Sequence, residues 1–399
     1  MVRMVERMVP SEEAALRLGV KVTTLYAYVS RGLLASHREP GGRRSVFDLT
    51  DIERLAVRQR GGRQVESRLA TITTGVTQLR QDGPFYRGRR ATELALDMAF
   101  EEVAALLWRA EEEGEWGTPD LGVGECPLLD ASDRMRWALV MCGATDPLRA
   151  DLRPAAVNRA ARRVIAALTD VVGKPLPVAG GSVALRLAHG LSGVARGEGA
   201  SLSAAAVDAA LVLLADHELA TSTVAVRIAA STRADLYDSL MAGLATMAGP
   251  LHGGASQRAY ELLVSAERNG AARALNDALR WHNHLPGFGH VIYKERDPRF
   301  DALWELAAPL LSAARRRLFL EVIDMAAAHD VPAPNCDLAL AALSWGTGMP
   351  PDAGRTIFTI ARVAGWTAHY QEELSERPLR FRARAIYTVD SNLATDPDG

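Results

Sequence analysis

Two histidines and one aspartate of this 399-residue chain stand where turns rich in Gly or Pro adjoin helical segments, and a third histidine lies in a largely apolar helical stretch. His252 lies in GPLHGGA, His290 ends GFGH, Asp337 ends PNCD, and His217 sits between two acids in DHELATST. The first N–H groups of a helix lack internal partners and its dipole makes that end positive, which favours a neutral imidazole. Such an imidazole can donate a hydrogen bond to a developing oxyanion, and a carboxylate can remove a proton. Each residue alone is typical of an ordinary structural position, but together they predict an active site.

The elements that must position these residues are predicted to be helices. Apolar residues recur at helical spacing in SVALRLAHGLSG, in AAAVDAALVLLADHELA, whose helix is expected to include His217, and in RTIFTIARVAGWTAHYQEEL. No alternation is long enough to predict a sheet, and no βαβ pattern occurs. Breaks are expected near residues 60–64, 111–122, 171–181 and 283–290. The main body is therefore expected to be all-α.

A short N-terminal segment has a different organisation. Ser11 is a candidate N-cap for a first short helix, Gly19 follows at a turn, and a second helix is expected to start near Val22 and to end at Gly32. The stretch REPGGRRSVFDLTDIERL would add a small wing and a third helix. This pattern resembles the winged helix-turn-helix of excisionase-like and MerR-like regulators.

Charge is unevenly distributed along the chain. Residues 1–63 contain twelve Lys and Arg and seven Asp and Glu, a net charge of +5, whereas the whole chain has a net charge of −2. Lys21, Arg31, Arg43 and Arg44 near the presumed DNA-facing side favour contacts with phosphates. A protein–protein module built on the same fold explains the segment equally, so DNA is a candidate partner only.

The three cysteines, Cys126, Cys142 and Cys336, are few, odd in number and far apart. They favour a reducing compartment and argue against a Cys-based zinc site. The charged N-terminus lacks the apolar core of a signal peptide, and no apolar run is long enough to span a bilayer. A cytoplasmic protein with no membrane and no metal site is expected.

Taken in order, the motifs resemble those of the citrate synthase family. The resemblance runs from about residue 66 to 388 and rests on FYRGRRATELALDMAFEEVAALLW, DHELATST, GPLHGGA, GFGH followed by YK and DPR, PNCD, and TIARVAGWTAHYQE. It implies an all-α citrate synthase fold preceded by a small winged helix-turn-helix domain. The implied domains are the helix-turn-helix over 1–60, a large domain over 66–253, a small domain over 254–349, and a return to the large domain with a C-terminal arm over 350–399.

The resemblance implies a condensation of acetyl-CoA with oxaloacetate, followed by hydrolysis of the citryl-CoA intermediate. Asp337 would be the base that removes a proton from the acetyl methyl group, and His252 would donate to the thioester oxygen as the enol or enolate forms. His290 would hydrogen-bond the ketone and protonate the alkoxide. Acetyl-CoA would be a co-substrate, and neither a metal nor a permanently bound cofactor is expected.

A dicarboxylate substrate needs cations, and the resemblance supplies candidates. Arg299, Arg362 and Arg382, with His217 as a further donor, match the substrate-binding positions. The last arginine would come from the partner subunit, which implies a homodimer; Arg380 and Arg384 are alternatives because the motif reads RAR where RPR is common. Lys294 and Arg296 are candidates for the phosphates of CoA.

Two alternatives stay open. Propionyl-CoA in place of acetyl-CoA would make the protein a 2-methylcitrate synthase, and one methylene in a pocket discriminates by only about 1–3 kcal/mol. The chain could also be a DNA-binding regulator that senses metabolites through a synthase-like body.

Overall fold

The computed structural model describes residues 8–18, 20–38, 45–48, 51–52, 72–110, 116–117, 119–122, 126–173, 180–192, 197–281 and 285–382. These residues fall into two compact units. One contains the N-terminal head, up to Ile72, together with the residues from Phe381 on, and the other is a body over Thr73–Arg380. The boundaries at 253/254 and 349/350 that divide the body into large and small domains stay predictions.

The head pairs two short helices with a small sheet, as expected for a winged helix-turn-helix. Strands β1 (Met8–Pro10), β2 (His37–Arg38) and β3 (Ser45–Asp48) form an antiparallel sheet in the order β1-β3-β2. Helix α1 (Ser11–Leu18) packs on β1, on β3 and on α2 (Val22–Ser30), and Tyr26 of α2 contacts Phe47 of β3. Leu25, Phe47 and Ile52 are fully buried in its core. Asp51 and Ile52 are helical, but the rest of the expected third helix lies outside the described residues, as do Arg43 and Arg44.

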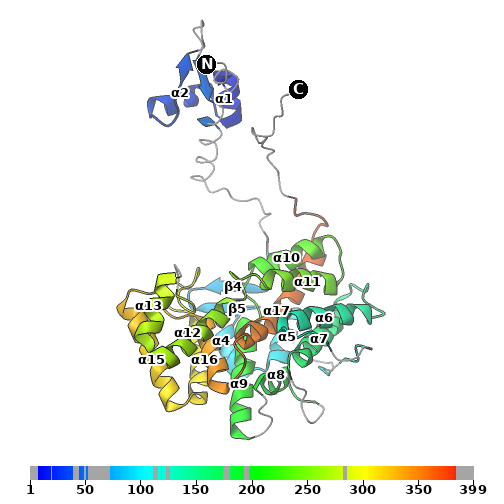
Figure 1. Cartoon of the computed structure of the whole chain (residues 1–399). Coiled ribbons are helices and arrows are strands. Elements are labelled where there is room, and N and C mark those ends of the chain that lie inside the picture. The colour runs from blue at the N-terminus through cyan, green and yellow to red at the C-terminus, as the bar shows by residue number, and fades with distance from the viewer. Residues whose placement is uncertain are drawn as a thin grey trace, which may run out of the picture. The chain divides into compact units, whose positions relative to one another are not determined.

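The body consists mainly of helices (Figure 1). They are α4 (Ala91–Asp97), α5 (Phe100–Trp108), α6 (Ala131–Ala144), α7 (Pro154–Val171), α8 (Val183–Ser192), α9 (Glu198–Leu214), α10 (Thr221–Ser231), α11 (Leu236–Met247), α12 (Ala255–Asn269), α13 (Ala271–Trp281), α14 (Pro298–Ala307), α15 (Ala313–Ala328), α16 (Cys336–Thr347) and α17 (Ala353–Leu374), with a 3-10 turn at Ala308–Leu310. The helices expected over 182–193 and 355–374 are confirmed by α8 and α17.

A second three-stranded sheet was not expected from the sequence. Strands β4 (Thr77–Arg80), β5 (Gly83–Tyr86) and β6 (Arg89–Arg90) pair antiparallel in that order, with Thr77 opposite Tyr86. Strands this short cannot show the alternation that identifies a strand in a sequence. Because a tight turn joins each pair, local pairing suffices to form the sheet.

Helix α17 runs through the middle of the body and is buried on nearly all sides from Ala353 to Tyr370. It packs against α5, α7, α9, α10 and α11 and also touches α12 and α16. Helices α12 to α16 pack largely on one another. The ends of α9, α10, α12 and α16 therefore meet near the side chains of one central helix.

Candidate active site

The two histidines His217 and His290 lie against each other, although they come from distant parts of the chain. His217 follows α9, and His290 follows the Gly-Phe-Gly turn before α14. Their ring centroids are 5.3 Å apart in an edge-to-face arrangement. The ring of Tyr293 stacks on His290 at 4.7 Å, and all three rings belong to one aromatic cluster. The structure thus brings together two of the residues that the sequence predicted to share a site.

The expected helix around His217 ends earlier than predicted. Helix α9 stops at Leu214, so His217 lies in a turn between α9 and α10, and the placement of His217 inside a helix was wrong. The Asp216 carboxylate accepts a hydrogen bond of 3.0 Å from the N–H of Glu218, and Glu218 has a left-handed φ of 54°. An Asp side chain that bonds to the backbone two residues on competes with helix formation.

His290 is held in one tautomer by its own loop. Its Nδ1 accepts hydrogen bonds from the N–H groups of Ile292 at 3.1 Å and Tyr293 at 3.2 Å, which leaves the ring proton on Nε2. Burial, together with the charge of Arg299, lowers the pKa of His290 to about 4. Its Nε2 lies 3.3 Å from an Nη2 of Arg299. Two donors converge there, an arrangement suited to a ligand oxygen.

Arg299 forms a buried two-point ion pair with Asp297. Its Nε and Nη2 donate to the two carboxylate oxygens at 3.0 and 2.9 Å, and both residues are almost fully buried. Asp297 also caps α14 by accepting from the N–H of Arg299, and it accepts from the N–H of Cys336 at the start of α16. Burial alone would raise the pKa of Asp297, but the charge of Arg299 holds it below its usual value. Asp297, which the sequence analysis did not select, ties Arg299 to the helix that carries Asp337.

Asp337 lies in the first turn of α16. The side chain of Asn335, the N-cap, accepts a hydrogen bond from its N–H at 3.0 Å. Among the described residues no donor is hydrogen-bonded to the Asp337 carboxylate. Burial raises the pKa of Asp337 to about 6, and the charge of Arg299 only partly opposes this rise. A carboxyl group with this pKa is ionised near neutral pH and is a stronger base than an exposed aspartate.

His252 occupies the turn before α12, as expected, and its partner is Ser222 at the start of α10. The His252 Nε2 and the Ser222 Oγ are 2.8 Å apart, and the indole N–H of Trp366 donates to the same oxygen at 3.3 Å. The hydroxyl of Ser222 can accept from the indole N–H and can still either donate to Nε2 or accept from it, so these contacts fix the position of the His252 ring and permit both tautomers. Burial and then the charge of Arg362 lower the pKa of His252, which favours the neutral ring.

Several buried polar atoms lack partners within the described residues, and two of them belong to predicted substrate-binding residues. They are Nε2 of His217 and Nη1 of Arg362, whose Nε donates to the carbonyl of Leu214 at 3.1 Å. Burial, followed by the charges of Arg299 and Arg362, lowers the pKa of His217 well below its usual value. Buried polar atoms without partners are costly, and a polar ligand would satisfy them. Arg299 and Arg362 supply positive charge in the same region.

Three predicted residues do not join this group. Lys294 and Arg296 are exposed, and Arg296 pairs with Asp301 on the surface. Arg382 is exposed, is the last described residue and lies outside the body unit. Of its two alternatives, Arg380 forms a two-point ion pair of 2.6 Å with Glu373, and Arg384 lies outside the described residues. Roles for Lys294, Arg296 and Arg382 stay predictions.

In the described part of the chain, no group of three or more His, Cys, Asp or Glu side chains is arranged to hold a metal ion. No described helix combines the length and apolar character needed to cross a membrane.

The chain matches two known families in separate segments. Residues 127–384 match the family model described as citrate synthase, C-terminal domain, and residues 11–60 match a helix-turn-helix domain. The body is also similar in fold to the citrate synthase of Thermoplasma acidophilum, solved in a ternary complex with carboxymethyl coenzyme A and oxaloacetate. That similarity has a TM-score of 0.68 at 22% identity and covers 85% of this chain and 98% of the other.

The curated relatives of this chain include both citrate synthases and 2-methylcitrate synthases. A citrate synthase of Saccharolobus solfataricus is 35% identical over 46% of this chain and 51% of its own length, so the alignment spans about half of that protein. Citrate synthase 2 of Bacillus subtilis is 27% identical over 82% of this chain and 95% of its own length. 2-Methylcitrate synthase 2 of Corynebacterium glutamicum is 29% identical over 74% of this chain and 86% of its own length.

Proposed function

The chain belongs to the citrate synthase family of acyltransferases, and we propose that it condenses acetyl-CoA with oxaloacetate and hydrolyses the citryl-CoA intermediate to citrate and CoA. One observation carries this proposal: the carboxylate of Asp337 lies within the field of the buried guanidinium of Arg299, and that guanidinium lies 3.3 Å from Nε2 of the neutral His290. A base, a neutral donor and a fixed cation are the groups that the reaction needs.

The first step would form the nucleophile. Asp337 removes a proton from the acetyl methyl group while the Nδ1–H of His252 donates to the thioester oxygen. Donation from a neutral imidazole stabilises the enol or enolate as it forms, which a carboxylate alone could not achieve against so weak an acid. Ser222 contacts Nε2 of His252, so the nitrogen that donates in this step is Nδ1, and Trp366 donates to the same Ser222 oxygen.

The second step would form the carbon–carbon bond. The methyl carbon attacks the ketone of oxaloacetate, and the Nε2–H of His290 donates to that oxygen as it becomes an alkoxide. Arg299, Arg362 and Arg382, with His217, hold the carboxylates. Water then hydrolyses the citryl thioester. Acetyl-CoA is a co-substrate, and no cofactor is bound permanently.

Release of free thiol from CoA tests the activity and the choice of substrate. With oxaloacetate present, we expect turnover with acetyl-CoA and a lower kcat/KM with propionyl-CoA. A preference for propionyl-CoA would make the product 2-methylcitrate, consistent with the Corynebacterium relative. Thiol release from neither substrate would refute the proposed function.

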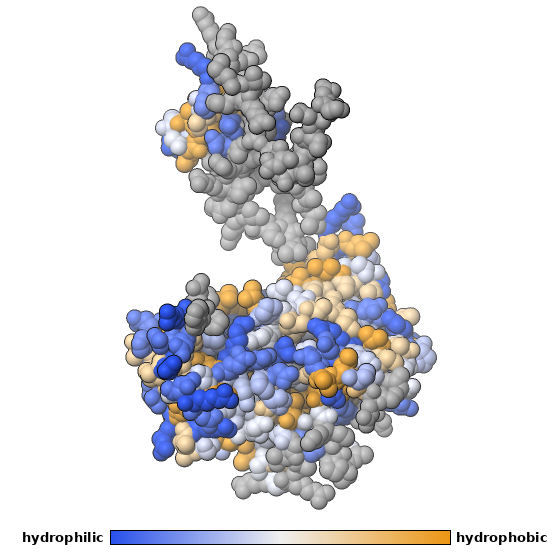
Figure 2. Space-filling model, in the orientation of Figure 1, coloured by the Kyte–Doolittle hydropathy of each residue, from blue (hydrophilic) through white to orange (hydrophobic). Residues whose placement is uncertain are grey.

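We also propose that the body forms a homodimer. Figure 2 shows apolar side chains gathered over α10 and α11, and Ile228 on α10 is 42% exposed. Exposed apolar patches of this kind mark interaction surfaces. The dimer would let Arg382 of one chain complete the site of its partner.

Shared sites predict complementation between inactive variants. Asp337→Ala and Arg382→Ala proteins, mixed under conditions that exchange subunits, are expected to recover part of the activity, because a hybrid dimer contains one site with both residues intact. Exchange is followed by mass spectrometry with one partner isotopically labelled. Confirmed exchange without recovered activity would contradict the sharing of Arg382.

For the head, duplex DNA is the proposed second partner, in line with its helix-turn-helix match. Lys21 and Arg31 at the two ends of α2 and Arg38 in β2 are exposed, in places from which they could reach phosphates. Selection from random duplexes, repeated across salt concentrations, is expected to yield binding that weakens steeply as salt rises. Binding unaffected by salt, or none, would leave the head as a docking module of the enzyme.

A further inference from the structure

The turn that carries His217 is fixed from every side. The hydroxyl of Tyr86 lies within hydrogen-bond distance, 3.1 Å, of the carbonyls of Leu213 and Asp216, and the N–H of Asp216 donates back to that hydroxyl. The Asp216 carboxylate, fully buried, accepts the N–H of Glu218. Both neighbours of His217 in the chain are therefore bonded, and the conformation of this turn decides where the His217 ring points.

His369 on α17 holds the Asp216 carboxylate. Its Nε2 lies 3.3 Å from Asp216 Oδ2, and its Nδ1 lies 3.0 Å from an Nη1 of Arg227. A guanidinium has only donors, so Nδ1 must accept and the ring proton must sit on Nε2, directed at Asp216. Burial alone would raise the pKa of Asp216, and the contact with His369 and the charge of Arg362 hold it below its usual value.

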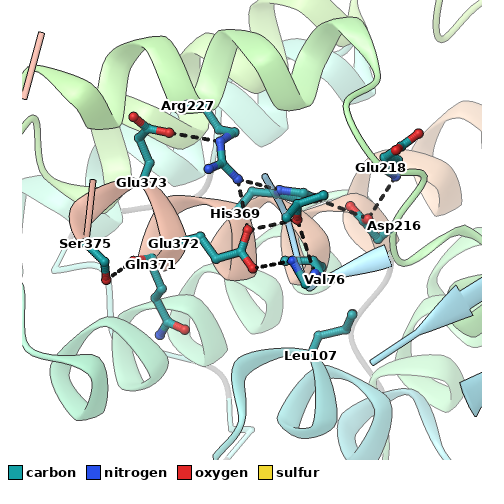
Figure 3. Close-up of polar contacts among 12 residues, drawn as sticks. Val76, Leu107, Asp216, Glu218, Arg227, His369, Gln371, Glu372, Glu373 and Ser375 are labelled. Atoms are coloured by element: carbon teal, nitrogen blue, oxygen red, sulfur yellow. Dashed lines mark hydrogen bonds and ion pairs between the residues drawn. The ribbon is translucent and has the colours of Figure 1, made fainter. Parts of the chain in front are cut away.

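Arg227 is itself fixed in a buried network (Figure 3). Its Nε donates to Glu373 at 2.9 Å and its Nη1 to Glu372 at 3.1 Å, and Arg227, Glu373 and His369 are fully buried. Glu372 also accepts from the N–H of Gly75. The buried cation of Arg227, and not solvent, thus determines which ring nitrogen of His369 carries the proton.

The residues responsible lie along one face of α17, which we call the α17 stripe: Arg362, Gly365, Trp366, His369 and Glu373. Their spacing is that of one helical face. The N–H of Gly365 donates to the carbonyl of Ala215 at 3.0 Å, and a Cβ at Gly365 would lie 2.3 Å from an Asp216 oxygen, so only Gly permits this approach. Trp366 reaches His252 through Ser222, and His369 reaches the turn of His217 through Asp216.

We propose that the α17 stripe positions two histidines through separate branches: His369 and Asp216 set the orientation of His217 for oxaloacetate, and Trp366 and Ser222 set the position of the His252 ring for the acyl-CoA. His369, Asp216, Trp366 and Ser222 are positioning residues in this scheme. The assignment of substrates to the two branches rests on the proposed function.

Each branch has its own kinetic signature. His369→Leu is expected to raise the KM for oxaloacetate by about 10- to 100-fold and to leave the KM for the acyl-CoA nearly unchanged, since small displacements of binding groups have effects of this size. His369→Gln is expected to restore most of the affinity, because an amide can accept from Arg227 and donate to Asp216. Trp366→Phe is expected to lower kcat and to leave the KM for oxaloacetate unchanged.

Thr367→Val is the matched control. Thr367 is fully buried on the same helix, but in the described part of the chain its hydroxyl bonds only to the carbonyl of Val363 within α17. If this variant raises the KM for oxaloacetate as His369→Leu does, or if His369→Gln shows no rescue, the scheme is wrong and the effect is general loosening of the helix.

A readout without turnover separates this scheme from the proposed function. The imidazole 15N signals of His217, identified by their loss in His217→Asn, are expected to shift in His369→Leu and to stay in place in Thr367→Val. Unchanged signals in His369→Leu would overturn the scheme, whatever the protein catalyses. If the signals shift in His369→Leu but the folded wild-type protein releases no thiol, the scheme is supported and the proposed function is refuted.

Discussion

Asp337→Ala is expected to lower kcat by about 10²- to 10⁴-fold, the usual contribution of a general base. The carboxylate lies at the start of α16 with no hydrogen-bonded donor among the described residues, so its oxygens are available to take the proton. Steady-state thiol release measures the loss. Binding of oxaloacetate is expected to persist in the variant, because Arg299 and Arg362 are untouched. Near-normal turnover would show that Asp337 is not the base.

The pKa of Asp337 adds a second test of the same role. Activity requires the ionised carboxylate, so the kcat/KM for the acyl-CoA is expected to fall below about pH 6, where Asp337 protonates. His290, with a pKa of about 4, stays neutral through this range and does not set the profile. A pH–rate profile that is flat from pH 5 to 8 would contradict the assignment.

The stability effect of Asp337 has the opposite sign to its catalytic effect. Because the pKa in the folded protein is raised to about 6 from 3.8, the stability linked to the protonated carboxyl is present below the unfolded pKa and lost as the pH rises through 6. Asp337→Asn is therefore expected to raise Tm at pH 8 and to change it little at pH 4. A variant that loses activity while gaining stability cannot be inactive through unfolding.

Arg299→Ala is expected to lower the free energy of unfolding by about 3–5 kcal/mol, because it leaves the Asp297 carboxylate buried without its cation. Asp297 is 2% exposed and Arg299 is 3% exposed, so solvent cannot replace the lost partner. Denaturant unfolding measures the change. Binding of oxaloacetate is expected to weaken as well, since the same guanidinium faces the site beside His290.

Two further variants test whether the lost stability comes from the unpaired buried charge of Asp297. Asp297→Asn combined with Arg299→Ala is expected to recover part of the stability, because no unpaired charge then remains. Arg296→Ala, three residues away, breaks only the exposed pair with Asp301 and is expected to cost less than about 1 kcal/mol. Equal losses from Arg296→Ala and Arg299→Ala would contradict the role given to burial.

Part of the site could be predicted because its residues carry local signals. Gly and Pro flank His252, His290 and Asp337 and mark the ends of helices, where such side chains meet. Helices α8 and α17 follow from their apolar spacing. The presence of a separate N-terminal head follows from its two short helices and the basic charge of the first 63 residues.

The rest depends on contacts that a linear pattern cannot show. Ser222 bonds to a Trp366 that is 144 residues away in the chain, and in the sequence it is an ordinary polar residue at the start of a helix. For Asp297 the signal was partial: Asp before Pro predicts a helix cap, but not the ion pair with Arg299. The sequence predicts a helix at His217 because the apolar spacing continues past Leu214. This spacing does not reveal that Glu218 adopts a left-handed backbone conformation. Arg382 would act only in a partner chain, which no single chain can show.

The α17 stripe limits how this gene can change in length. One codon inserted or deleted between those for Arg362 and His369 would rotate the following part of the helix by about 100° relative to the preceding part. Wherever the change falls in this interval, Arg362 would then no longer lie on the face that carries His369. A change before the codon for Gly365 would also put a residue with a side chain at the place of the close approach. Single substitutions on the other faces of α17 leave this alignment intact. Across related sequences, insertions and deletions should therefore collect in the loops on either side of this helix and be absent from its middle turns.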